Sequence, residues 1–231
     1  MNKFENIDIY TADPCVAMDM VARTPWDHYV PPYEVVSGVY SVSGIEWVSS
    51  FLIDTGDGLI LIDTGLHESV YLLIDSIYRL GFKLNDIRMI LLSHMHSDHC
   101  GNAAALQKLG MKLLMTEPDY RFMNRLDWQP RGLWYAAEGM PAEVWKGSLN
   151  KNPAAQYVSG PFDIVPLNDR DTLEYGGYTL RCIVTPGHTP GHMCLYIPEE
   201  KLLFSGDHVL FDITPNICAV APGDDMLGEY L

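Results

Sequence analysis

The sequence has few basic residues and no long apolar run. Its 15 lysine and arginine residues stand against 30 aspartate and glutamate residues, which gives a formal net charge of −15. Such a surface repels phosphate groups, so neither nucleic acid nor an anionic membrane is an expected partner. No apolar stretch approaches the roughly 20 residues of a membrane span. The N-terminus also lacks a basic start followed by an apolar stretch, so no signal peptide is expected and the predicted location is cytoplasmic.

Cysteine is also scarce and widely spaced. No C-x-x-C pair occurs, and the number of cysteines is odd, so the sequence predicts neither a disulfide framework nor a cysteine zinc site. Reduced, mostly buried thiols are the expectation. The five residues are Cys15, Cys100, Cys182, Cys194 and Cys218.

The chain of 231 residues is expected to form a single domain with a sizeable core. Apolar runs and a turn at residues 55–58 predict strands within 33–65. Helical periodicity then predicts a helix at 67–81 that ends at Gly81, and the pattern continues as strand, helix and strand up to residue 116. Further strands are expected at 178–185 and on either side of a turn at 198–200. This order predicts a layered α/β fold.

Two segments lack this periodicity. Residues 1–32 are expected to be an irregular N-terminal segment rich in proline. Residues 117–165 are expected to be an aromatic-rich insertion near the active site, either a lid or binding loop, or an aromatic mini-core or oligomer contact. A homodimer is possible on the last reading. The aromatic residues of this segment that we expect to line a substrate pocket are Trp128, Trp134, Tyr135 and Trp145.

The stretch LLSHMHSDHCGN is the strongest chemical signal. His94 and His96 follow a buried strand, and residues two apart on an extended chain point the same way, so both imidazoles can bind one ion. Asp98 and His99 come at the turn into the next helix, where a bend can bring them to a second ion. Imidazole and carboxylate ligands suit zinc, iron or manganese better than calcium or magnesium.

Two later segments place similar side chains at strand ends. In TPGHTPGH, His188 follows a predicted strand, and in LLFSGDHVL, Asp207 does the same. Ligands from the same ends of several strands converge on one edge of a sheet, where α/β proteins place their sites. His28, His67, His192 and His208, taken singly, are expected to be ordinary core or surface histidines.

The motifs SHMHSDH, TPGH and SGD, in this order and preceded by LILIDTG, resemble the metal motifs of the metallo-β-lactamase superfamily, in particular its glyoxalase II and lactonase-like members. The resemblance spans roughly residues 35–212. It implies a four-layer αββα sandwich with a dinuclear metal site at one edge, zinc being the expected metal and iron or manganese the alternatives.

The resemblance also implies roles for individual residues. His94, His96 and His188 would bind the first metal, Asp98 and His99 the second, and Asp207 both. Asp63 would orient the metal-binding loop. Two further residues, Ser93 and Thr189, are expected to support the ligands by hydrogen bonds, and Asp98 is the expected catalytic residue.

The family pattern includes a final histidine that completes the second metal site, and this sequence has no histidine after His208. We therefore expect a complete first site and a second site that is weak or empty. The closing residues read as the start of a helix cut short, so the second half of the fold is expected to be incomplete at the C-terminus. His208 is a poor substitute ligand but a candidate proton donor, and His208 and Phe211 are candidate pocket residues.

The expected function is metal-dependent hydrolysis of a small-molecule ester, thioester or lactone. A hydroxide held by the metals would attack, because zinc lowers the pKa of bound water to about 7, and Asp98 would orient it. Three alternatives remain open. These are a mononuclear non-haem iron oxidoreductase acting on a sulfur compound, as in persulfide dioxygenases, a β-lactamase-type amide hydrolase, and an inactive fragment or subunit.

Overall fold

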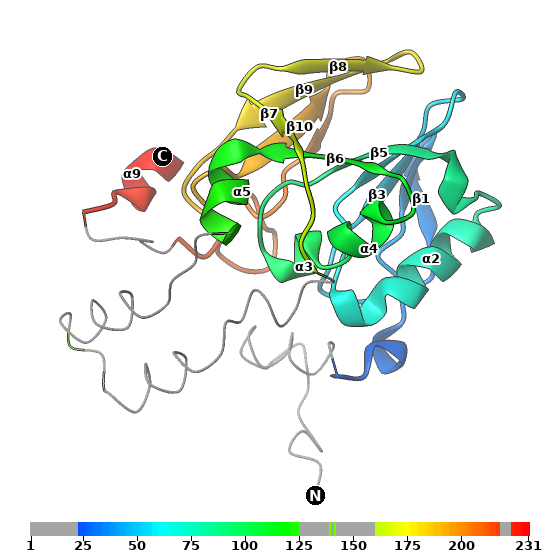
Figure 1. The fold of residues 1–231 in the computed structure, drawn as a ribbon, viewed down its shortest axis with the longest axis horizontal. Helices are drawn as coiled ribbons and strands as arrows, with labels where there is room; N and C mark the ends of the chain where they lie inside the picture. Colours follow the sequence, from blue (N-terminus) through cyan, green and yellow to red (C-terminus); the bar gives the residue numbers. More distant parts are fainter. Residues whose placement is uncertain (1–22, 125–138, 140, 142–159, 218–222) are drawn as a thin grey trace, which may run out of the picture.

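The computed structural model describes residues 23–124, 139, 141, 160–217 and 223–231 of the chain. Within these ranges, two β-sheets pack face to face, and helices cover the outer face of the larger sheet (Figure 1). None of the described helices has the length and apolar character needed to cross a bilayer.

The larger sheet has seven strands that follow one another in sequence order. The first four pair antiparallel, and the last three continue in parallel register from the fourth. Parallel neighbours require crossover connections, which the helices between them provide. The strands are β1 (Tyr33–Val36), β2 (Val39–Ser41), β3 (Phe51–Asp54), β4 (Leu59–Ile62), β5 (Ile87–Leu91), β6 (Lys112–Thr116) and β7 (Val165–Leu167).

Short helices cover the outer face of this sheet. The longest, α2, buries Leu72, Leu73 and Ile77, and the last two share a core with Leu61 and Ile90 of the sheet. The described helices are α2 (Val70–Arg79), α3 (Ser97–Cys100), α4 (Ala103–Gln107), α5 (Glu117–Asn124) and α9 (Met226–Tyr230), with 3-10 turns η1 (Pro25–His28), η2 (His67–Ser69) and η3 (Leu84–Asp86).

The smaller sheet is antiparallel, in the order β11-β10-β9-β8. A second core lies between the sheets, where Leu195 and Ile197 pack with Ile60 and Ile62 of the larger sheet. Among the described residues, the outer face of the smaller sheet remains exposed at Ile183 and Leu203. Its strands are β8 (Thr172–Tyr175), β9 (Tyr178–Val184), β10 (Met193–Ile197) and β11 (Leu202–Phe204).

The layered α/β fold predicted from the sequence is confirmed, and the predicted strands and helices are present with ends shifted by a few residues. Gly81 has a φ of +88°, the left-handed conformation expected of a glycine that ends a helix. The segment 117–165 differs from the prediction at both ends, because its first eight residues form α5 and its last residue begins β7. Its tryptophans and Tyr135 lie outside the described residues.

One end of the two-sheet assembly carries the chemistry. The loops that follow β4 and β5 and the helix α5 that follows β6 leave the carboxyl ends of neighbouring parallel strands, and the β9–β10 loop and the turn after β11 meet them there. These five segments contain Asp63, His94, Asp119, His188 and Asp207.

Candidate metal centre

The loop after β5 brings two imidazoles together. His94 Nε2 lies 3.1 Å from His96 Nδ1, so the two histidines face each other through different ring nitrogens. The short helix α3 then turns the chain and presents Asp98 and His99 beside them. The H-x-H-x-D-H spacing therefore combines an extended loop with one helical turn, and all four side chains reach the same region.

His188 and Asp207 complete the first group of candidate ligands. His188 Nε2 lies 2.9 Å from His96 Nδ1 and 3.3 Å from Asp207 Oδ2, and the same carboxylate oxygen lies 3.9 Å from His94 Nε2. The ligand atoms of these four residues all lie within 4.8 Å of one another. We refer to His94, His96, His188 and Asp207 as the first group.

A second group shares Asp207 with the first. His99 Nε2 lies 3.1 Å from Asp207 Oδ1 and 3.5 Å from Asp98 Oδ2. Asp98, His99 and Asp207, here called the second group, could also hold an ion between them. Among the described residues, no fourth side chain joins this group.

Burial decides the protonation of the first group. Burial lowers the pKa of His94 well below its usual value, lowers that of His96 to about 4, and lowers that of His188 as well. These three imidazoles are therefore neutral at pH 7, which is the form that binds metal. Burial alone would raise the pKa of Asp207, but the hydrogen bond and charge of His99 hold it far below its usual value.

His99 is different. Burial alone would lower its pKa, but the carboxylates of Asp98 and Asp63 hold it well above its usual value. Asp63 Oδ2 lies 2.8 Å from His99 Nδ1 and also accepts a hydrogen bond from Ser93 Oγ, while Asp63 Oδ1 accepts one from Ser93 N. Asp63 thus holds the metal-binding loop at two points and directs His99 Nε2 towards Asp207.

Asp63 adopts a left-handed backbone conformation, with a φ of +58°. Non-glycine residues rarely do so, and aspartate is among those that tolerate it best. This conformation follows directly after β4 and turns the carboxylate back under the loop after β5. Asp63 therefore contacts both Ser93 and His99 of the metal-binding loop, and its role in orienting metal ligands stays a prediction.

The donor set fits a transition metal. Four ligands placed tetrahedrally at about 2.0–2.1 Å from a zinc ion lie about 3.3 Å apart. The nitrogen–nitrogen distances of 2.9 and 3.1 Å in the first group are close to this spacing. His188 Nδ1 also lies 2.7 Å from the backbone oxygen of Asn216, to which it can donate, so that Nε2 is left free as a ligand.

Two supporting residues were not identified from the sequence. His192 is fully buried, lies 2.8 Å from Thr185 Oγ1 through Nδ1, and accepts the backbone N–H of Asp207 at Nε2, at 3.1 Å. It thus holds the segment that carries Asp207. In the sequence, His192 could have been noticed because TPGHTPGH repeats the Pro-Gly-His triplet that contains His188. Asp119, also fully buried, hydrogen-bonds to Thr189 and had no comparable signal.

His208 lies apart from both groups. It follows Asp207, but its ring packs 4.5 Å from the ring of Tyr230, measured between centroids. Its side chain does not line the groove described next, because the chain turns after Asp207. Of the two predicted pocket residues, Phe211 lines that groove and His208 does not, and their roles towards a substrate stay predictions.

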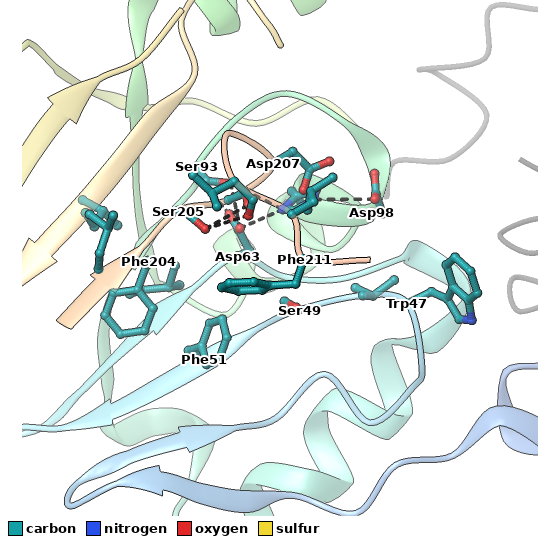
Figure 2. A pocket seen from close by; sticks show the side chains of 18 of the residues that line it. Trp47, Ser49, Phe51, Asp63, Ser93, Asp98, Phe204, Ser205, Asp207 and Phe211 are labelled. Carbon is teal, nitrogen blue, oxygen red and sulfur yellow. Dashed lines mark hydrogen bonds and ion pairs between the residues drawn. The ribbon is translucent and has the colours of Figure 1, made fainter. Parts of the chain in front are cut away.

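A groove of about 1140 Å³ runs between the two sheets and ends at the second group (Figure 2). Phe51, Phe204 and Phe211 lie along it, while Asp98 and Asp207 lie at its polar end. An apolar wall that leads to a few polar groups is typical of small-molecule sites.

Comparisons with known proteins support the same assignment. A family model described as the metallo-beta-lactamase superfamily matches residues 47–225. A metallo-beta-lactamase family protein from Thermus thermophilus has a similar structure, with a TM-score of 0.72 and 26% identity over 85% of this chain and 68% of that one.

Three curated relatives share 25–27% identity with this chain. "Lactamase-like protein ptaB" of Pestalotiopsis fici is 27% identical over 72% of this chain and 41% of its own length. An "Atrochrysone carboxyl ACP thioesterase" of Aspergillus fumigatus is 25% identical over 72% and 30%. "Probable metallo-hydrolase YybB" of Bacillus subtilis is 26% identical over 69% and 61%. The chain thus spans less than two thirds of the length of each.

Proposed function

Because this chain belongs to the metallo-β-lactamase superfamily, we propose that it is a metal-dependent hydrolase of a small-molecule ester or lactone, and most specifically of a thioester. The observation that carries this proposal is the convergence of His94, His96, His188 and Asp207 on one point at the end of the two sheets. Three neutral imidazoles and a carboxylate at this spacing suit zinc, which we propose as the metal.

In this proposal the two groups of residues have different roles. The first group would hold one metal and the second group another, with Asp207 common to both. Bound there, zinc supplies a Lewis acid that acidifies water and polarises a carbonyl group. Asp98 lies at the polar end of the groove and is only partly buried, so its carboxylate can orient a water molecule and accept its proton.

His99 carries a positive charge in the metal-free protein. The nearby carboxylates of Asp63 and Asp98 keep its imidazole charged, and its Nε2 points at Asp207. In the metal-free protein this proton stabilises the cluster of carboxylates, and metal binding at the second group has to displace it. The charge of His99 is therefore a measurable sign of whether the second group is occupied.

Two observations favour a thioester. One relative carries the name of a thioesterase, and the groove beside the second group presents aromatic side chains that suit an apolar acyl group. The formal charge of −15 disfavours polynucleotide substrates, which leaves phosphodiesters of nucleic acids low in rank.

The test is a substrate panel on protein reconstituted with zinc, with the chelated protein as control. Acyl thioesters of increasing chain length should be hydrolysed fastest, followed by lactones and aryl esters, with a β-lactam slowest. Activity should disappear on chelation and return with zinc. Equal rates with and without metal would overturn the hydrolase proposal, and preference for the β-lactam would overturn its thioester part.

The same first group favours a second candidate function. A subset of its residues, His188 and Asp207 with either His94 or His96, would give the two histidines and one carboxylate that suit a non-haem iron oxygenase, which needs only one metal. If purified protein holds one iron per chain and consumes oxygen with a persulfide, while the thioester rate stays at background, this second candidate replaces the hydrolase.

A further inference from the structure

One buried carboxylate near the metal centre belongs to neither group of ligands. Asp119 lies in the first turn of α5, directly after β6, and is fully buried. Its carboxylate takes part in neither candidate metal group. Burial raises its pKa to about 6, although hydrogen bonds from Thr189, Gly191 and Met95 oppose that rise. A carboxylate kept in such surroundings is expected to make contacts that offset the cost of its burial.

The contacts of Asp119 reach two separate loops. Its Oδ2 accepts the backbone N–H of Met95 at 3.0 Å and the hydroxyl of Thr189 at 2.7 Å. Its Oδ1 accepts the backbone N–H of Gly191 at 2.5 Å. Met95 stands between His94 and His96, and Thr189 directly follows His188.

Those two loops come from different sheets. The loop with His94 and His96 follows β5 of the larger sheet, whereas the loop with His188 follows β9 of the smaller one. The side chain of Asp119 therefore connects the backbone of both loops, in addition to a backbone hydrogen bond from Met193 N to Ser93 O, in a region where the two sheets share no strand pair.

The close approach of Gly191 supports this arrangement. A Cβ added at Gly191 would lie 2.6 Å from the backbone nitrogen of Asp119 and 3.0 Å from its Oδ1. Any larger residue would push the His188 loop away from α5. The hydroxyl of Thr116 also donates to the backbone oxygen of Gly191, which adds a second hold on the same residue.

We propose that Asp119 is a positioning residue that sets the distance between the His94–His96 pair and His188, and thereby the affinity of the first group for its metal. The inference rests on the proposed function, since it concerns a metal that the first group would bind. Asp119 does not act on substrate, because its contacts are with loop backbone and with Thr189.

The chemistry requires a carboxylate rather than an amide. Both oxygens of Asp119 accept backbone N–H groups, so an asparagine at this position has one acceptor too few. In either orientation its NH₂ group would face the N–H of Met95 or of Gly191. One loop would then lose its hold while the size of the side chain stays the same.

The test compares metal affinity in matched variants of the full chain. Asp119→Asn is the main variant, Thr189→Ser retains the hydroxyl, and Glu117→Gln makes the same acid-to-amide change at an exposed position of the same helix. Zinc affinity is measured by competition with a chromophoric chelator. The visible spectrum of the cobalt-substituted protein reports the geometry of the ligands.

We expect Asp119→Asn to weaken the tighter zinc site about tenfold or more and to change the cobalt spectrum, since partners that orient ligands are typically worth about 10–100-fold in metal affinity. Thr189→Ser and Glu117→Gln should stay within about twofold of wild type. If Asp119→Asn fails to fold, Thr189→Val supplies the same test by removing one hydrogen bond, with a smaller expected loss of about threefold.

Two results would overturn the inference. Wild-type affinity and spectrum in a folded Asp119→Asn protein, or in Thr189→Val when Asp119→Asn does not fold, would show that Asp119 has no positioning role. Absence of zinc binding by the wild-type protein would instead overturn the proposed function, and this inference with it. The wild-type measurement therefore separates the two failures.

Discussion

The two groups of candidate ligands share Asp207 and differ in almost everything else. The first group draws three imidazoles from loops of both sheets, and burial keeps all three neutral. The second group has two other members, Asp98 and His99, both from α3, and the surrounding carboxylates keep His99 charged. The neutral imidazoles of the first group can bind a metal directly, whereas a metal at the second group must displace the proton of His99.

The supporting contacts differ in the same way. Asp119 and His192 hold the first group through backbone contacts to both sheets, whereas Asp63 holds His99 from one side and the groove opens on the other. Two metal sites that share one ligand can therefore differ in affinity. We expect the first to fill before the second.

The largest effect should come from breaking the first group. His96→Ala removes an imidazole that contacts both His94 and His188, and should reduce hydrolysis about 10³-fold or more, because a catalytic metal supplies several kcal/mol. Steady-state kinetics with a thioester measures the loss. The exposed His67→Ala serves as control and should behave as wild type. Retained activity in His96→Ala would contradict the role of the first group.

A smaller effect is expected in the second group. Asp98→Asn keeps the size of the side chain but removes a metal ligand and proton acceptor, so kcat should fall about 10²-fold while one tightly bound metal remains. Metal content after dialysis and the rate on the same thioester measure both parts. Loss of both metals in this variant would show that the two groups do not bind independently.

His192 offers a test of stability rather than chemistry. His192→Phe removes the acceptor for the backbone N–H of Asp207 and should destabilise the fold by about 1–3 kcal/mol, the usual cost of an unsatisfied buried donor. Urea unfolding measures the change. His208→Phe, at a half-buried ring that lies outside both groups, is the matched control and should cost less. Equal stability of the two variants would show that the hydrogen bond from Asp207 N to His192 does not stabilise the fold.

The pH dependence of the metal-free protein tests the same difference. Burial lowers the pKa of His96 to about 4 and that of His192 to about 3, below the value of about 6.5 in the unfolded chain. The unfolded state therefore binds more protons in this range, and stability falls as the pH drops below about 6.5. Each histidine contributes about 1 kcal/mol between pH 6.5 and 5.5.

His99 and Asp119 have the opposite sign, because their pKa values are raised. The contribution of His99 is nearly complete below pH 6.5, and the protonation of Asp119 near pH 6 offsets only part of the loss from the histidines. Urea unfolding of chelated protein at pH 7.5, 6.5 and 5.5 checks the prediction. Stability that is constant or rises towards pH 5.5 would show that the imidazoles of the first group are not held neutral.

The smallest effect is expected along the groove. Phe211 is 96% exposed, so Phe211→Ala should leave stability unchanged. It should raise KM for long acyl thioesters less than about fivefold, which corresponds to under about 1 kcal/mol of lost contact. A short acetyl thioester should show no change and serves as the control. An equal change in KM for both substrates would show that Phe211 does not contact the acyl chain.

The fold and the ligands were predictable for different reasons. Alternating and helical apolar patterns predicted the strands and α2, and the closely spaced H-x-H-x-D-H motif indicated its chemistry within six residues. His188 and Asp207 were found because each follows a strand. The helix α5 was missed inside an aromatic-rich segment, although Glu117 and Asp119 in its first turn are typical of a helix start.

The supporting residues could not be read from local patterns. Asp119 lies 24 residues from Met95 and 72 from Gly191 in sequence, and only the packing of α5 against both loops brings them together. His192 lies 15 residues from Asp207, whose backbone N–H donates a hydrogen bond to it. Supporting roles depend on contacts between residues far apart in sequence, whereas a metal ligand can be recognised in the sequence by its residue type and spacing. The roles of Trp128 and the other aromatic residues of the middle segment stay predictions.

A zinc titration of the chelated protein tests the difference between the two groups most directly. We predict two unequal binding events, of which His99→Ala abolishes only the weaker and His96→Ala the tighter. Two equal events, no binding at micromolar zinc, or a tight event that survives His96→Ala would contradict the assignment of the first group as the principal metal site.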